Sequence, residues 1–276
     1  MMMMVSRLGL MALLLSGCAA SNPLPAIFDG PNLHTKIQGQ GRPGVVLESG
    51  AGDGIDSWTG LSARLADKTT VFSYQRSRRG GEPRTGAQVA EQLLDTLRQK
   101  GMDPPYILVG HSIGGPFVLS FAKRYPDLVA GLVLVDGRPP GFKAACEAGG
   151  GTMCDIPAWA LMLTEPWVRA EVQGLPATYA ELGDLARLPA VPAVVISATE
   201  PPPLSNAAFM TAWLAQQREM ARSLPQARYV QADGSGHYVH KERTDLVARE
   251  ILTLVRAAGQ TANNSLNKPA PQARGL

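Results

Sequence analysis

Short runs of apolar residues recur along the chain, and glycine, proline or polar residues end each of them. Runs of this length, rich in valine, leucine and isoleucine and bounded by turn residues, are typical of buried strands. They predict strands at residues 26–37, 45–48, 70–74, 106–109, 131–135, 191–197 and 227–232.

Between these runs the apolar positions follow a helical period. In residues 86–100, for example, Val89, Leu93, Leu94 and Leu97 fall on one face of a helix. The same reasoning predicts helices at 117–125, 206–223 and 244–257. Strands that alternate with helices build a mostly parallel sheet covered on both faces. We therefore expect an α/β fold.

Two segments depart from this alternation. Residues 138–187 contain a glycine run, a cysteine pair and tryptophans within short helical pieces, which predicts an inserted lid. Residues 259–276 are polar, with repeated Asn, Pro and Gln, and predict a disordered tail. The core is expected to comprise residues 26–137 and 188–258.

Length and composition fit one domain. The chain has 276 residues, of which 45% are hydrophobic and 18% charged, as expected for a single globular core. The formal charge of +3 is small and dispersed, which argues against nucleic acid as a partner. A basic loop at 75–84 is interpreted either as an anion-attracting rim or as a solvated loop.

The first residues predict export. Arg7 precedes a short apolar run, Leu8 to Leu15, which suits a signal peptide over residues 1–17 rather than a spanning helix. The ending Leu15-Ser16-Gly17-Cys18 resembles the lipobox of bacterial lipoproteins; the alternative is an ordinary secretory signal. The resemblance implies a lipid anchor on Cys18 and a tether over 18–25. It implies a location in the bacterial cell envelope, at the outer membrane facing the periplasm, because Ala19 is not the aspartate associated with inner-membrane retention.

Two further cysteines, Cys146 and Cys154, lie eight positions apart across a glycine-rich loop. In an oxidising compartment such a pair is predicted to form a disulfide, with two free thiols as the alternative. No histidine or further cysteine lies near them in the sequence, so a metal site is not expected.

The stretch Gly110-His111-Ser112-Ile113-Gly114 follows a predicted strand and precedes a predicted helix. This is the pattern and the setting of a nucleophile elbow, in which a sharp turn lifts the serine hydroxyl above the edge of the sheet. The glycines two positions before and after Ser112 fit such a turn, because larger side chains there would clash.

Other reactive groups follow other predicted strands. Asp136, the 197–200 loop and His237 do so, and the carboxyl ends of parallel strands share one edge of a sheet. A serine hydroxyl needs an adjacent base, and that base needs an orienting acid. His237, in a glycine-flanked loop, is the expected base. Among the other histidines, His111 is expected to flank the pocket and His240 to be exposed.

Three blocks resemble the α/β-hydrolase family in its esterase- or peroxidase-like branch. They are Val45 to Gly52 with Ser57-Trp58, Pro104 to Gly115, and Gly234 to His237. The first block has Ser49-Gly50 where the family usually has His-Gly. The resemblance implies an oxyanion hole formed by the amides of Ala51 and Ile113.

The family also implies two positions for the triad acid. It usually follows the strand after the lid, where this chain offers only Glu200, but some members place it at the end of the preceding strand, where Asp136 stands. We favour Asp136 and keep Glu200 as the alternative.

Together these features predict a serine hydrolase that cleaves a small-molecule carboxylic ester through an acyl-enzyme, without cofactor or metal. An amide, lactone or carbon–carbon bond hydrolase, or a cofactor-free peroxidase, would use the same triad. A different class of protein, a non-catalytic envelope lipoprotein that binds a ligand, is the further alternative.

Overall fold

The computed structural model describes residues 33–78 and 81–266, with side chains to residue 260. The predicted signal peptide, Cys18 and the tether lie outside the described residues. Within the described part, no helix is both long and apolar enough to span a membrane.

Seven strands form one sheet in the order β1-β3-β2-β4-β5-β6-β7. The strands are β1 (Thr35–Gln38), β2 (Gly44–Glu48), β3 (Val71–Tyr74), β4 (Tyr106–His111), β5 (Val129–Val135), β6 (Ala193–Ala198) and β7 (Ala227–Ala232). All neighbours are parallel except β1, which runs antiparallel to β3. The predicted α/β class and the mostly parallel sheet are confirmed.

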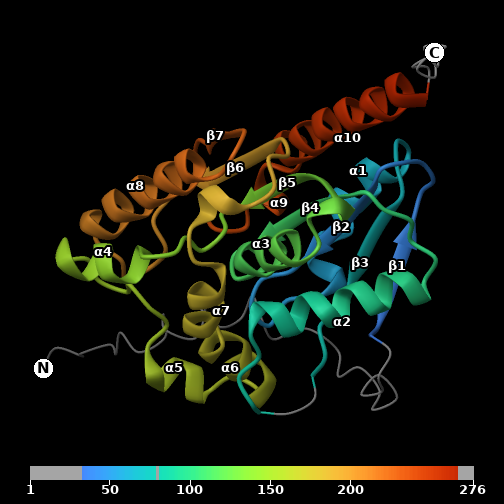
Figure 1. The fold of residues 1–276 in the computed structure, drawn as a ribbon. Helices are drawn as coiled ribbons and strands as arrows, with labels where there is room; N and C mark the ends of the chain where they lie inside the picture. Colours follow the sequence, from blue (N-terminus) through green and yellow to red (C-terminus); the bar gives the residue numbers. More distant parts are fainter. Residues whose placement is uncertain (1–32, 79–80, 267–276) are drawn as a thin grey trace, which may run out of the picture.

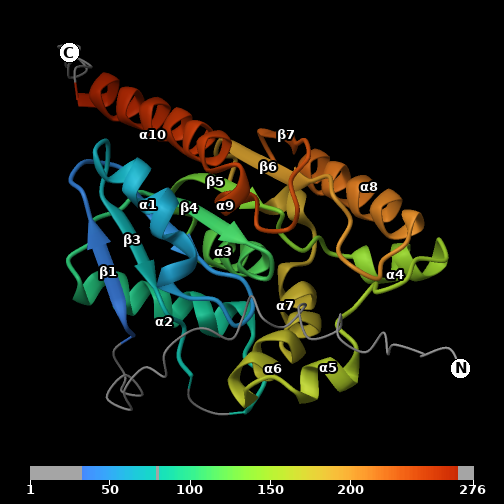
Figure 2. The ribbon, with the colours of Figure 1, turned by 180° about the vertical axis from the view of Figure 1, so that it is seen from behind.

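Helices cover both faces of the sheet (Figures 1 and 2). One face packs against α2 (Gly86–Gln99), α3 (Gly114–Arg124) and α8 (Ala207–Ser223), and the other against α1 (Thr59–Ala66) and α10 (Thr244–Leu266). Strand β2 shows how the sequence divides between the two cores. Val46 packs with the first group, whereas Val45 and Leu47 pack with the second, because successive side chains of a strand point to opposite faces.

The segment between β5 and β6 holds four helices, which lie within the predicted lid. They are α4 (Phe142–Ala148), α5 (Ala158–Met162), α6 (Pro166–Gln173) and α7 (Leu175–Leu182). Helix α4 lies along α8, while α5, α6 and α7 stack together beyond the end of the sheet (Figures 1 and 2). The predicted disulfide is present: Cys146 of α4 joins Cys154, with their Cα atoms 5.6 Å apart.

One boundary differs from the prediction. Helix α10 continues to Leu266, so residues 259–266 are helical rather than part of a disordered tail. Residues 259–266 are polar, and the prediction of disorder was based on that composition. A helix that extends beyond the core needs no apolar face, so composition alone did not indicate it. The other short helices are α9 (Val239–Glu242) and the 3-10 turns Ile55–Trp58, Pro126–Leu128 and Leu185–Arg187, of which the last lies within the predicted lid.

Candidate active site

Ser112 occupies the sharp turn between β4 and α3. Its φ angle is 55°, in the left-handed region that non-glycine residues rarely adopt. The flanking glycines permit this turn, since a Cβ at Gly110 would clash with the carbonyl of Gly114, and one at Gly114 with the carbonyl of Glu48. The turn is also tied to β5 and the segment after it, because the Ser112 amide donates to the carbonyl of Val135 at 3.3 Å and the Ser112 carbonyl accepts a 2.9 Å bond from the Arg138 amide.

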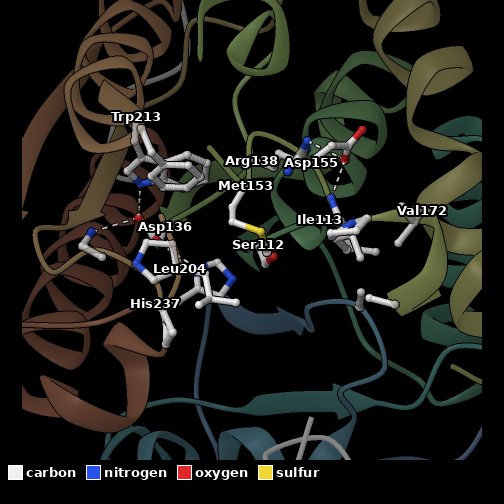
Figure 3. A pocket seen from close by; sticks show the side chains of 18 of the residues that line it. Ser112, Ile113, Asp136, Arg138, Met153, Asp155, Val172, Leu204, Trp213 and His237 are labelled. Atoms are coloured by element: carbon white, nitrogen blue, oxygen red, sulfur yellow. Dashed lines mark hydrogen bonds and ion pairs between the residues drawn. The ribbon is translucent and has the colours of Figure 1, made fainter. Parts of the chain in front are cut away.

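Asp136 stands directly after β5 and points toward His237 (Figure 3). Its Oδ2 lies 2.6 Å from Nδ1 of His237. Its Oδ1 accepts two further bonds, from the backbone amide of Ala198 at 2.9 Å and from Nε1 of Trp213 at 2.8 Å. The carboxyl group is buried and each oxygen has a donor, so its orientation is fixed.

Glu200 lines the same cavity but makes a different set of contacts. Its backbone amide donates to the carbonyl of Ser235 at 3.0 Å, and among the described residues its side chain has no hydrogen bond or ion pair. The geometry therefore pairs His237 with Asp136 and not with Glu200.

The hydroxyl of Ser112 and the ring of His237 line one cavity. No hydrogen bond between them is formed in the described part of the chain. Hydrogen bonds between catalytic groups are often long in ligand-free enzymes and tighten when substrate binds.

The loop after β2 brings a second backbone segment to the serine. Ala51 lines the cavity together with Ile113, and neither amide donates a hydrogen bond within the described residues. Ser49, which replaces the family's usual histidine, is buried and accepts a 2.7 Å bond from Nε1 of Trp58. Its hydroxyl also donates to the carbonyl of Gly54 at 3.2 Å, which closes the loop on itself.

The cavity beside Ser112 has a volume of about 400 Å³. Its walls are mostly apolar and come from the lid, from the 200–204 loop and from α8 (Figure 3): Met153, Ile156, Trp159, Val172, Leu175, Leu204, Phe209, Met210 and Trp213. Polar groups are few. Besides the residues already described, Arg138 pairs with Asp155 at 3.0 Å in the wall. Such a cavity suits a small apolar group next to a polar reacting centre.

The sequence profile of the Alpha/beta hydrolase family matches residues 45–250. The chain belongs to this family. It is 26% identical over 247 residues to the uncharacterized protein YqjL of Bacillus subtilis, which covers 85% of this chain and 92% of that protein. Among solved structures, a thermophilic esterase from Thermogutta terrifontis superposes with a TM-score of 0.63 at 21% identity, covering 82% of this chain and 93% of that one.

A putative non-heme bromoperoxidase, BpoC from Mycobacterium tuberculosis, has a TM-score of 0.62 at 20% identity, with 82% and 96% of the two chains covered. These likenesses concern the fold. With the family match they confirm the expected fold and identify the protein as a hydrolase enzyme.

Two histidines of this hydrolase lie behind the pocket. His111 is buried, and its Nε2 is 2.9 Å from the carbonyl of His237. Since a carbonyl only accepts, Nε2 carries the proton, and Nδ1 is left without a hydrogen bond. Burial lowers the pKa of His111 well below its usual value. The ring is not among the side chains that line the cavity; it lies behind His237, with ring centroids 4.7 Å apart, and supports the backbone of His237.

His240 was expected to be exposed, and this prediction is wrong. Its ring is buried against Trp58, with centroids 4.3 Å apart, and its Nε2 lies 3.0 Å from the hydroxyl of Ser57. Burial, aided by the charge of Lys241, lowers the pKa of His240 to about 3. The error arose because Lys241 suggested a solvated turn, whereas His240 lies on the inner side of helix α9.

The first arginine of the basic loop at 75–84 belongs neither to an anion-attracting rim nor to a solvated surface, because it is buried. Arg76 is 2% exposed and lies between Glu48 and Glu171. Arg84 is 18% exposed and lies 3.7 Å from Glu171, and the Arg78 guanidinium lies over the ring of Trp167 at 5.2 Å. This cluster could not be predicted from local sequence patterns, because Glu171 lies in the lid, 95 positions from Arg76.

Proposed function

We propose that this hydrolase cleaves a small carboxylic ester through an acyl-enzyme formed on Ser112. His237 acts as the general base and Asp136 holds its ring. The observation that carries the proposal is the 2.6 Å contact between His237 Nδ1 and Asp136 Oδ2, in a cavity that Ser112 also lines. The proton on Nδ1 is then shared with the carboxylate, which leaves Nε2 free to accept the serine proton.

In the first half of the reaction, the Ser112 oxygen attacks the ester carbonyl carbon while His237 takes the hydroxyl proton. The oxyanion accepts hydrogen bonds from the amides of Ala51 and Ile113, and the ester C–O bond then breaks. His237 returns the proton to the leaving alcohol. In the second half, water attacks the acyl-enzyme by the same route and releases the acid and free Ser112.

The apolar walls favour an ester whose acyl or aryl group is small and uncharged. A cavity of about 400 Å³ lies at the lower end of the range for small-molecule sites, so long or branched acyl groups are poor candidates. The charged or polar residues that line it include Ser112, His237, Glu200 and the Arg138–Asp155 pair.

Labelling with a fluorophosphonate, followed by mass spectrometry of the intact protein, tests the nucleophile. We expect one adduct on the wild type and none on Ser112→Ala. Hydrolysis of p-nitrophenyl acetate and butyrate tests the ester preference in the same preparations. An unlabelled wild type, or equal labelling of Ser112→Ala, contradicts the proposal. Labelling without ester turnover would retain the nucleophile and direct the search to amides, lactones or carbon–carbon bonds.

A further inference from the structure

The guanidinium of Arg76 is held in a fully occupied site next to the loop that carries Ala51. Its five N–H groups all have acceptors. Nε and Nη2 bind the two oxygens of Glu171 at 2.7 and 2.8 Å. Nη1 binds a carboxylate oxygen of Glu48, and the guanidinium also lies over the ring of Phe117 at 5.4 Å.

The remaining two donors bind main-chain carbonyls of the loop after β2. Nη1 donates to the carbonyl of Ser49 and Nη2 to that of Gly50, each at 2.6 Å. The carbonyl of Gly50 and the amide of Ala51 belong to one peptide unit. Within residues 33–78 and 81–266 the cis peptides are those before Pro43 and Pro105, so this unit is trans.

In a planar trans peptide the C=O and N–H bonds point in opposite directions. Fixing the Gly50 carbonyl on the buried side therefore fixes the Ala51 N–H on the other side, where Ala51 lines the cavity with Ser112. The loop is also close to the elbow: a Cβ at Gly50 would lie 3.2 Å from Cβ of Ser112. We infer that Arg76 is a positioning residue of the oxyanion hole, which aims the Ala51 amide by holding the carbonyl of Gly50.

The charge of Arg76 acts in the same direction as its geometry. A cation bound to a carbonyl polarises the peptide unit and makes its N–H a stronger donor. The same guanidinium holds Glu171 of the lid helix α6, whose next residue, Val172, lines the cavity. Arg76 thus connects the oxyanion donor with a wall of the pocket.

Stability alone is a weak reason for such a cluster. The free energy needed to remove two charges from water is about as large as the attraction that they gain as a buried ion pair. Apolar replacements of similar size are for this reason often neutral or stabilising. Burial raises the pKa of Glu48, so this carboxyl becomes neutral more readily if the arginine is removed. The double variant Arg76→Met/Glu171→Met can therefore retain the fold while it removes the shorter of two bonds to the Gly50 carbonyl, which also accepts a 3.3 Å bond from the Asp53 amide.

The inference rests on the proposed function, because that function assigns Ala51 to the oxyanion hole. The test compares wild type, Arg76→Lys, Arg76→Met/Glu171→Met and the control Arg84→Met. Arg84 also lies beside Glu171, but its Nη2 donates a hydrogen bond to the carbonyl of Ser77 at 2.7 Å, away from the 49–51 loop. Thermal unfolding confirms that each variant is folded. The probe is phenylboronic acid, which forms a tetrahedral adduct with an active serine.

We expect the double variant to bind phenylboronic acid about 10- to 100-fold more weakly, less than the full loss of one oxyanion donor. The kcat for p-nitrophenyl butyrate should fall by the same factor, with KM changed less than about threefold, because the donor acts mainly in the transition state. Arg76→Lys keeps the charge but not the planar, forked guanidinium. Its boronate affinity and its kcat should therefore lie between those of wild type and those of the double variant. Arg84→Met should match wild type within about twofold.

The amide proton of Ala51 in a 1H–15N spectrum gives a readout that needs no turnover. The chemical shift of this proton should change in Arg76→Met/Glu171→Met and remain that of the wild type in Arg84→Met. A folded double variant with wild-type boronate affinity, or with an unmoved Ala51 amide, overturns the inference, as does a change confined to KM. If wild type hydrolyses no ester, the ester proposal fails on its own, and the boronate ratio and the Ala51 shift still decide the role of Arg76.

Discussion

Replacing Asp136 with asparagine should remove most of the activity, because the surrounding donors dictate how the new amide is oriented. The backbone N–H of Ala198 and the indole N–H of Trp213 both point at Oδ1. An asparagine oxygen must take that place. Its NH2 group then faces Nδ1 of His237, which has to accept the bond, so the ring proton moves to Nε2. In that tautomer His237 cannot take the proton of Ser112.

The magnitude follows from the cost of turning the amide round. Turning it would leave the donors of Ala198 and Trp213 without acceptors, at about 1–3 kcal/mol for each buried group. The total of about 2–6 kcal/mol corresponds to a fall in kcat between about 30-fold and about 3 × 10⁴-fold. This range overlaps the usual contribution of general base catalysis, about 10²- to 10⁴-fold.

Trp213→Phe provides an internal check, since it removes one of the two donors. In the Trp213→Phe background, the logarithm of the fall in kcat caused by Asp136→Asn should be about half as large. The amide can then turn round with the loss of only one hydrogen bond, the one from Ala198. Steady-state kinetics on p-nitrophenyl butyrate with the two single variants and the double variant measures the difference. An equal or larger fall in the Trp213→Phe background refutes the reasoning. So does a Glu200→Gln variant that loses as much activity as Asp136→Asn.

Three further predictions concern stability and location. The pKa of His240 in the folded chain, about 3, lies below the usual 6.5. Between these two pH values only the unfolded chain takes up this proton. The free energy of unfolding therefore falls as the pH is lowered from about 6.5. The difference in free energy of unfolding between wild type and His240→Asn should therefore shrink by about 1.4 kcal/mol per pH unit in urea titrations below pH 6.5, and a constant difference contradicts this. Cys146→Ser/Cys154→Ser should lose about 2–3 kcal/mol for its short loop, and reductant should destabilise only the wild type. Cys18→Ser should move the expressed protein from the detergent phase to the aqueous phase in Triton X-114 partitioning; equal partitioning argues against the anchor.

Local patterns account for what the sequence could predict. The apolar runs before Ser112, Asp136 and His237 are strands in the structure, and the parallel sheet brings their ends to one edge. The elbow is also a local feature, because Gly110 and Gly114 are needed within five residues of chain. The disulfide could be predicted from the spacing of Cys146 and Cys154 together with the expectation of an oxidising compartment.

Contacts across long stretches of chain could not be predicted in the same way. The acid remained ambiguous because Asp136 and Glu200 both follow strands, and the difference between them lies in donors from Ala198 and from Trp213 of α8. The burial of His240 depends on Trp58, which lies 182 positions away in the chain. Arg76 could be recognised only once Glu171 of the lid had been placed beside it.

The placement of Trp213 couples substrate binding to the acid. The indole donates to Asp136, lines the cavity and packs edge-on against Phe142 of α4, with ring centroids 4.7 Å apart. The disulfide between Cys146 and Cys154 lies in the same cluster. A change in the lid that moves α4 therefore also moves a donor to the carboxyl group that orients His237. Substitutions of Phe142 should for this reason lower kcat as well as raise KM, whereas a wall residue without such a link, such as the exposed Trp159 of α5, should act mainly on KM.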